Sequence, residues 1–275
     1  MRGPTPFRRA VATLVGLLLV AAAGCDGPIV ARSPEALYRL AQQQLANSQF
    51  RAATDTLKRV SREAPTSDPG RRAALLHIAL EGGLARGYRS MGDAYLAGSK
   101  QAGEAPHAPQ MRALAVDYFG RARGESIEMM ESAEWLMKQP AAEAFRLDVP
   151  PRTLEAVVFL EQVRAGKPVT DAQRAQAEQQ EIWRGIQATV GAVGGSGTAV
   201  EPAVFYLGAA RDLLETIELF GPEKLNEPHM TRLFYERAAG FARHAAQRAQ
   251  AKGDQKSRQE AEAVIQRCQE ALAKR

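Results

Sequence analysis

The sequence predicts an all-α protein of about nine helices that pack as antiparallel hairpins. From Ser33 onward the chain is rich in Ala, Leu, Gln, Glu and Arg, which favour helix. Apolar residues recur three and four positions apart, and no stretch sustains the alternation that is typical of a strand. Proline and glycine interrupt this pattern at the points where one helix ends and the next begins.

The N-terminus reads as an export signal. Three arginines precede an apolar run at residues 10–23, which is too short for a stable membrane span. The run ends in Ala-Ala-Gly-Cys at residues 22–25, which resembles the lipobox of bacterial lipoproteins. The resemblance implies that residues 1–24 are a removed signal peptide and that Cys25 carries the lipid. Residues 25–32 would then be a tether, and residues 33–275 a helical domain anchored to a membrane on its periplasmic face.

Two questions about this segment stay open at the level of sequence. The small residues at positions 21–23 also fit an ordinary signal cleavage, which would leave a soluble exported protein. Asp26 resembles a retention signal for the inner membrane in some bacteria, but that rule differs between groups. The choice between inner and outer membrane is therefore left open.

Removal of the leader changes what the charge implies. The full chain has a formal net charge of +5, and the leader contains three arginines and no acid, so its loss lowers the charge by three, to +2. Such a weakly charged chain is not expected to bind nucleic acid. Acylation of Cys25 would leave Cys268 without a disulfide partner, because the sequence contains 2 cysteines. Cys268 follows Val264 by four residues, so we expect it to be a small buried residue on an apolar helix face.

Each predicted helix has its own start and stop signals. Ser33 caps the first helix, with proline in its first turn, and Pro65 stops the second. Thr170 and Gln173 fit a capping box, and Gly253-Asp254 turns the chain between the last two helices. Thr198 to Glu201 is expected to cap the seventh helix and Asn226 to open the eighth. The predicted ranges are about 34–46, 50–64, 68–97, 110–138, 153–165, 171–190, 199–220, 226–252 and 255–275.

The first helical pair, at residues 34–65, resembles a tetratricopeptide repeat. The matching positions are Leu37, Leu40, Ala41, Phe50, Ala53, Leu57, Val60 and Pro65, although Leu37 and Gln44 replace the usual tryptophan and tyrosine. The resemblance implies a tetratricopeptide-like α-solenoid, with a helical bundle as the alternative. Glycines at 82, 83 and 87 lie inside the third helix, where they are expected to admit a neighbouring backbone or to mark a kink.

The usual signatures of nucleotide and metal chemistry are weak. The glycine-rich stretch at residues 191–197 follows a predicted helix rather than a strand, and no lysine follows it, so a flexible loop is expected there. The four histidines show no metal-site spacing, and no metal or cofactor is predicted.

One enzyme hypothesis starts at Glu125-Ser126. This pair resembles the general-acid glutamate and serine of lytic transglycosylases, many of which are helical envelope lipoproteins. The later motifs of that family are missing, however, and Glu125, Glu128, Glu131 and Glu134 fit a solvent-facing stripe on a helix. We therefore expect a scaffold or adaptor for protein or peptide partners and not an enzyme. Tyr38, Gln42 and Gln44 are the candidate residues of a groove lined by the first and third helices.

Overall fold

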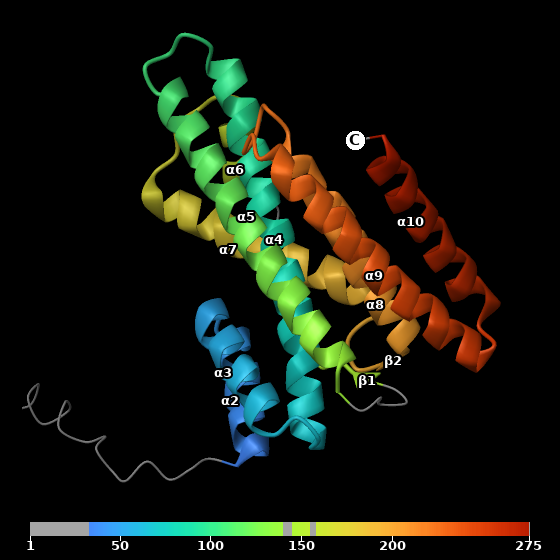
Figure 1. The fold of residues 1–275 in the computed structure, drawn as a ribbon. Coiled ribbons are helices and arrows are strands. Elements are labelled where there is room, and N and C mark those ends of the chain that lie inside the picture. Colours follow the sequence, from blue (N-terminus) through green and yellow to red (C-terminus); the bar gives the residue numbers. More distant parts are fainter. Residues whose placement is uncertain (1–32, 140–144, 155–157, 275) are drawn as a thin grey trace, which may run out of the picture. The chain divides into compact units, whose positions relative to one another are not determined.

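The fold is built from α-helices. The computed structural model describes residues 33–139, 145–154 and 158–274, and nine α-helices account for most of this part of the chain (Figure 1). The all-α prediction is thus confirmed. The helices are α2 (Pro34–Ala46), α3 (Phe50–Glu63), α4 (Asp68–Ala102), α5 (Ala108–Met137), α6 (Val158–Arg164), α7 (Asp171–Ala192), α8 (Pro202–Thr216), α9 (Pro228–Lys252) and α10 (Gln255–Ala273), and the 3-10 turn η1 (Ile217–Phe220) follows α8.

The helical domain is organised around the long hairpin of α4 and α5, which run side by side (Figure 1). The shorter pair α2 and α3 packs against α4 near its N-terminus, and α7 packs on another face of α4. Helix α8 joins this centre through α5, and α9 and α10 continue outward as a second set of antiparallel helices. α4 therefore contacts most of the elements that form the cavities described below.

Three glycines bring α4 and α7 into backbone contact. A Cβ added to Gly83 would lie 2.6 Å from the Cα of Ile186, and one added to Gly87 would lie 2.5 Å from the Cα of Ile182. On the other helix, a Cβ on Gly185 would lie 2.1 Å from the Gly83 carbonyl oxygen. The prediction that glycines in the third helix admit a neighbouring backbone is confirmed for Gly83 and Gly87.

Local signals define several helix ends as expected. The Thr170 hydroxyl accepts a hydrogen bond from the Gln173 backbone N–H, and the Gln173 side chain accepts one from the Thr170 N–H, so the capping box is present. Gly253 has a φ of 72° at the end of α9, in the left-handed region that glycine adopts at little cost. Asp254 then caps α10 by accepting a hydrogen bond of 3.1 Å from the Ser257 N–H.

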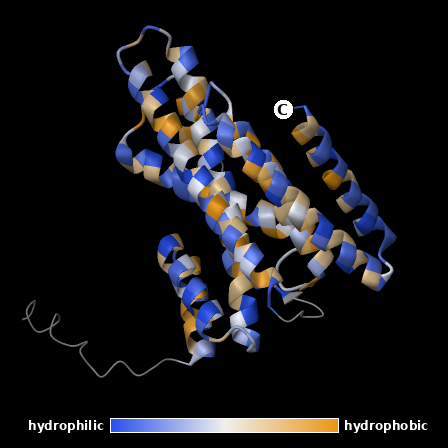
Figure 2. Ribbon diagram, viewed as in Figure 1, coloured by the Kyte–Doolittle hydropathy of each residue, from blue (hydrophilic) through white to orange (hydrophobic). Residues whose placement is uncertain are grey.

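The last helix has a mainly hydrophilic surface. Figure 2 shows α10 as polar along most of its length, with few apolar positions. Ser257, Ala261, Val264 and Cys268 are its buried residues and face α8 and α9. The prediction that Cys268 is buried on an apolar helix face is confirmed, and burial raises the pKa of its thiol.

A short β-ribbon was not predicted. Strand β1 (Phe145–Arg146) pairs antiparallel with β2 (Ala199–Val200), and the loop before β2 is fixed to the chain after β1. The Ser196 hydroxyl accepts a hydrogen bond of 2.8 Å from the Val149 N–H and donates one of 2.9 Å to the Val149 carbonyl. Two-residue strands are too short to produce the alternation that predicts a strand from sequence.

Several predicted boundaries were wrong. α8 begins at Pro202 with Glu201 at its N-cap, and the Thr198 hydroxyl instead bonds the carbonyls of Gly194 and Gly195 in the preceding loop. α9 begins at Pro228 rather than at Asn226. α6 begins at Val158 in the described part of the chain, and part of the range predicted for it, residues 155–157, lies outside that part.

The α2–α3 hairpin forms as the repeat-like spacing predicts. Leu37, Ala41, Ala53, Leu57 and Val60 are all buried between the two helices and α4. Helix length does not recur along the chain, however, because α2 and α3 have 13 and 14 residues whereas α4 and α5 have 35 and 30. The described residues therefore form a helical bundle rather than a solenoid of equal repeats.

Candidate functional site

An open groove lies between α7 and the turn that joins α2 to α3, and we call it the α7 groove. Its volume is about 650 Å³. Residues from this turn and the start of α3 form one wall, and α7 forms the other. Tyr88 of α4 also lines the groove. The lining residues are Ser48, Gln49, Phe50, Arg51, Ala52, Tyr88, Ala175, Gln176, Glu178, Gln179 and Ile182.

Ser48 holds the turn against α7. Its φ is 59°, which a residue with a side chain adopts only at a cost, and its hydroxyl accepts two hydrogen bonds. One comes from Trp183 Nε1 at 2.9 Å and the other from Arg152 Nη1 at 3.0 Å. Arg152 also stacks over the Trp183 ring, with its guanidinium carbon 5.2 Å from the ring centroid. These contacts fix the position of one wall relative to the other.

The apolar part of the α7 groove rests on aromatic packing. Phe50 meets Trp183 edge to face, with ring centroids 5.7 Å apart. Tyr88 stacks with Tyr118, and burial raises the pKa of Tyr88 to about 12. Phe50 is half-buried, whereas Tyr88 and Ile182 are 5% and 2% exposed, so Phe50 supplies most of the apolar surface that an incoming side chain can cover.

The charged side chains of the α7 groove differ in whether they already form ion pairs or hydrogen bonds within the described residues. Glu178 accepts a hydrogen bond of 2.8 Å from the Tyr118 hydroxyl and lies 3.7 Å from Arg121. Arg51 is exposed and forms no ion pair with the described residues. The groove therefore offers one cation that an incoming anionic group can neutralise, next to an anion that already has partners.

Three amide side chains add hydrogen-bonding capacity. Gln49, Gln176 and Gln179 line the groove, and within the described part of the chain their side chains make no hydrogen bond to the protein. Each amide can donate and accept. The repeat-like pattern gave no signal for these residues or for Arg51, because solvent-facing glutamine and arginine are common on any helix.

The residues proposed from sequence for a groove do not line this one. Tyr38 has 0% of its side chain exposed and packs in the core, with the Arg72 guanidinium carbon 4.6 Å from its ring centroid. Gln42 and Gln44 are half-buried, and the Gln44 side chain accepts a hydrogen bond of 2.9 Å from the Thr56 hydroxyl. The expectation of a groove between the first and third helices is corrected, because α7 and the α2–α3 turn form its walls.

Glu125 does not lie on a simple solvent-facing stripe. Burial and the adjacent Glu81 carboxyl raise the pKa of Glu125 to about 9. Glu134 also faces another helix and pairs with Arg237 of α9 at 2.8 Å, whereas Glu131 is exposed as predicted. The stripe prediction failed because α5 is covered by other helices on more than one side.

Glu125 belongs to a buried titratable cluster at the packing of α3, α4 and α5. His77 Nε2 lies 3.2 Å from Glu81 Oε1, and Glu81 is 3% exposed. Burial lowers the pKa of His77 to about 4 and raises that of Glu81, so His77 is neutral near pH 7. Neither this cluster nor Glu125 lines the α7 groove.

The described residues present neither a metal-binding group nor a membrane-spanning helix. No group of three or more His, Cys, Asp and Glu side chains among them is placed to hold a metal ion. Within residues 33–139, 145–154 and 158–274, no helix is long and apolar enough to cross a bilayer. Cys25 and the proposed signal peptide lie outside the described residues.

No protein-family model, curated protein or solved structure matches the chain.

Proposed function

We propose that this chain is a lipid-anchored adaptor of the bacterial envelope, which binds an extended segment of a partner protein in the α7 groove. The observation that carries the proposal is the juxtaposition of apolar side chains with a cation that forms no ion pair with the described residues. Phe50, Tyr88 and Ile182 lie beside Arg51, and they are flanked by three amide side chains that make no hydrogen bond to the described part of the chain.

The chemistry of the groove suggests the character of the segment. An apolar side chain would cover the Phe50, Tyr88 and Ile182 surface, and an acidic side chain nearby would pair with Arg51. The amides of Gln49, Gln176 and Gln179 suit the N–H and C=O groups of an extended backbone, which need partners once water is excluded. A segment with an aromatic or aliphatic residue next to Asp or Glu meets these requirements.

The anchor rests on sequence alone. The Ala-Ala-Gly-Cys segment and the basic and apolar residues before it support lipidation at Cys25. The short tether at residues 25–32 would keep the helical domain close to the membrane surface. A partner bound in the α7 groove would then be recruited to that surface.

Site-specific crosslinking tests the groove directly. A photo-reactive residue is placed at Gln179, which lines the groove, and a matched probe at Gln247, which is exposed on α9. In cells of the native host, the Gln179 probe is expected to give adducts that map to one recurring segment with adjacent apolar and acidic residues. Adducts that are absent, or that are the same from both positions, would count against the proposal.

A second candidate function is favoured by the raised pKa of Glu125. A carboxyl with a pKa of about 9 is protonated near neutral pH, as the general acid of a transglycosylase must be. Glu125 packs against Glu81 and does not line the α7 groove, although Arg51 and Tyr88 of that groove lie close enough to interact with its charge, and we therefore place this candidate second. The test is clearance of peptidoglycan by the purified protein. Clearance that is abolished in Glu125→Gln would favour the enzyme, and no clearance by the unaltered chain would remove it.

A further inference from the structure

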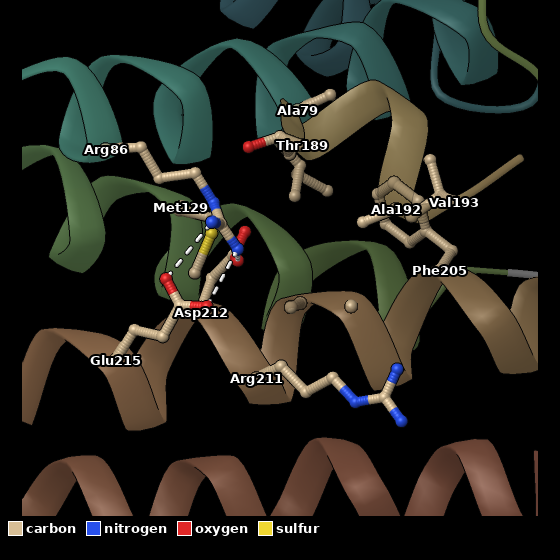
Figure 3. A pocket seen from close by; sticks show the side chains of 13 residues that line it. Ala79, Arg86, Met129, Thr189, Ala192, Val193, Phe205, Arg211, Asp212 and Glu215 are labelled. Atoms are coloured by element: carbon tan, nitrogen blue, oxygen red, sulfur yellow. Dashed lines mark hydrogen bonds and ion pairs between the residues drawn. The ribbon is translucent and has the colours of Figure 1, made fainter. Parts of the chain in front are cut away.

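A second cavity, separate from the α7 groove, lies among α4, α5, α7 and α8. Its volume is about 190 Å³. Figure 3 shows that its two ends differ in character. Arg86, Asp212 and Glu215 gather at one end, and Ala192, Val193 and Phe205 line the other. A molecule that fits this cavity would therefore have one polar end and an apolar body.

The charged end of the cavity is balanced. Arg86 donates two hydrogen bonds to Asp212 Oδ1 and lies 3.1 Å from Glu215 Oε2, and Arg89 lies 2.6 Å from the same Glu215 oxygen. Two cations thus face two anions. An ionic ligand would have to break one of these pairs, so the arrangement favours a neutral ligand.

Two polar atoms of the cavity have no hydrogen-bond partner in the described ranges. Thr189 is 7% exposed, and its hydroxyl makes no hydrogen bond within the part of the chain that the structure describes, although a helical threonine commonly bonds a carbonyl one turn back. Both hydrogen bonds to Asp212 reach Oδ1, and Oδ2 accepts none from the described residues. A buried hydroxyl without a partner costs free energy, which a bound hydrogen-bonding group would recover.

The Asp212 carboxylate and the Thr189 methyl group both approach α4 at Gly82. A Cβ added to Gly82 would lie 3.1 Å from Asp212 Oδ2 and 3.4 Å from Thr189 Cγ2. Gly82 therefore lets both side chains approach α4 at the same place. The Thr189 hydroxyl is on the same carbon as this methyl group, so a ligand hydroxyl in the cavity can donate to Asp212 Oδ2 and accept from Thr189.

The dimensions of the cavity set the size of the ligand. An apolar protein cavity of about 150 Å³ accommodates benzene. The cavity of about 190 Å³ has room for one ring and a small substituent. We propose that it binds a small neutral phenol or alcohol, whose hydroxyl lies between Thr189 and Asp212 and whose apolar body lies against Val193 and Phe205.

The ligand has a route to solvent at the polar end. The Glu215 side chain is 40% exposed, whereas that of Asp212 is 11% exposed. Arg211 extends away from the charged group and pairs with Glu260 of α10 at 2.8 Å, so it does not fill the space (Figure 3).

Fluorine NMR tests this inference with 4-fluorophenol and fluorobenzene as probes. The full chain is reconstituted in lipid nanodiscs, and empty nanodiscs correct for partition into lipid. We expect saturable binding of 4-fluorophenol that is about tenfold tighter than that of fluorobenzene. Thr189→Val, which replaces the hydroxyl by a methyl group, should remove that preference, and Thr189→Ser should retain it.

The outcomes separate a ligand site from a cavity that holds only water. If neither probe binds saturably to the unaltered chain, the inference is overturned. It is also overturned if the two probes bind equally well, or if a folded Thr189→Val protein keeps the preference for 4-fluorophenol. The comparison of the two probes on the unaltered chain stays decisive if the valine variant does not fold.

Discussion

Gly83 of α4 and Ile186 of α7 meet backbone to backbone. A Cβ on Gly83 would lie 2.6 Å from the Ile186 Cα and 2.7 Å from its backbone nitrogen, and neither atom can move without its helix. The pairing of α4 with α7 positions one wall of the α7 groove over Tyr88 of α4. The glycine is thus a structural requirement of the groove as well as of the core.

Replacement of Gly83 by alanine tests this contact. Overpacking typically costs about 1–3 kcal/mol, and the upper part of that range applies here because the clashing Ile186 atoms belong to the backbone, so the cost exceeds the gain of about 1 kcal/mol in helix propensity. We expect Gly83→Ala to lower the free energy of unfolding by about 1–2 kcal/mol in urea denaturation. Gly124→Ala on α5 is the matched control, because nothing lies within 4 Å of its Cβ position, and it should stabilise the protein slightly. A Gly83→Ala protein as stable as the Gly124→Ala control would show that the helices are farther apart.

The half-buried carboxyl of Glu125 makes stability depend on pH. Its pKa is about 9 in the folded chain and 4.5 as the ordinary value, so the folded state holds a proton that the unfolded state releases between these limits. Its stabilising contribution is therefore complete below about pH 4.5 and is lost as the pH rises toward 9. His77 acts in the opposite sense, because its pKa of about 4 lies below its ordinary value of 6.5 and costs stability as the pH falls between them.

Glu125→Gln isolates the first of these contributions. The amide stays neutral, and His77 is present in both proteins, so the variant should gain stability relative to the unaltered chain as the pH rises from 5 to 9. Urea denaturation at several pH values measures this difference. Glu131→Gln, at an exposed position on the same helix, should show no such trend. A constant difference between Glu125→Gln and the unaltered chain would mean that the Glu125 carboxyl ionises normally.

Lipidation at Cys25 is tested by fractionation. The unaltered chain is expected in the membrane fraction and should need detergent for release, because several acyl chains hold firmly. Cys25→Ser should lose the lipid and leave that fraction unless the uncleaved leader retains it, which the mass of the variant reveals. An unaltered chain that is released without detergent would instead favour a soluble exported protein.

Local signals made part of the fold predictable. Thr170 and Gln173 are three residues apart and cap α7 without help from other helices, and Gly253 ends α9 in the same local way. Glycines inside the third helix indicated a close neighbour, but the sequence could not identify α7 as that neighbour. Pairing between helices that are distant in sequence depends on the packing of the whole domain, so a short stretch of sequence does not predict it.

The site was less predictable than the fold. Tyr38 lies beside the packing positions of the first helix, and helical periodicity alone could not show that α4 covers it. Glu125 fits a polar stripe by spacing, yet its carboxyl meets Glu81 from a different helix. Arg51 is a candidate binding residue only because α7 places apolar residues opposite it and because it forms no ion pair with the described residues. Neither feature can be predicted from the sequence around Arg51.

The central claim is that Arg51 and the apolar surface beside it bind a partner segment. The most direct measurement is the affinity of a synthetic peptide, taken from the segment crosslinked at Gln179, for the full chain and for Arg51→Glu. We expect the charge reversal to weaken binding about tenfold and a reversed charge on the peptide to restore it. Arg59→Glu, an exposed change on the same helix outside the groove, should leave the affinity unchanged. Equal affinities for the unaltered chain and Arg51→Glu would contradict the account.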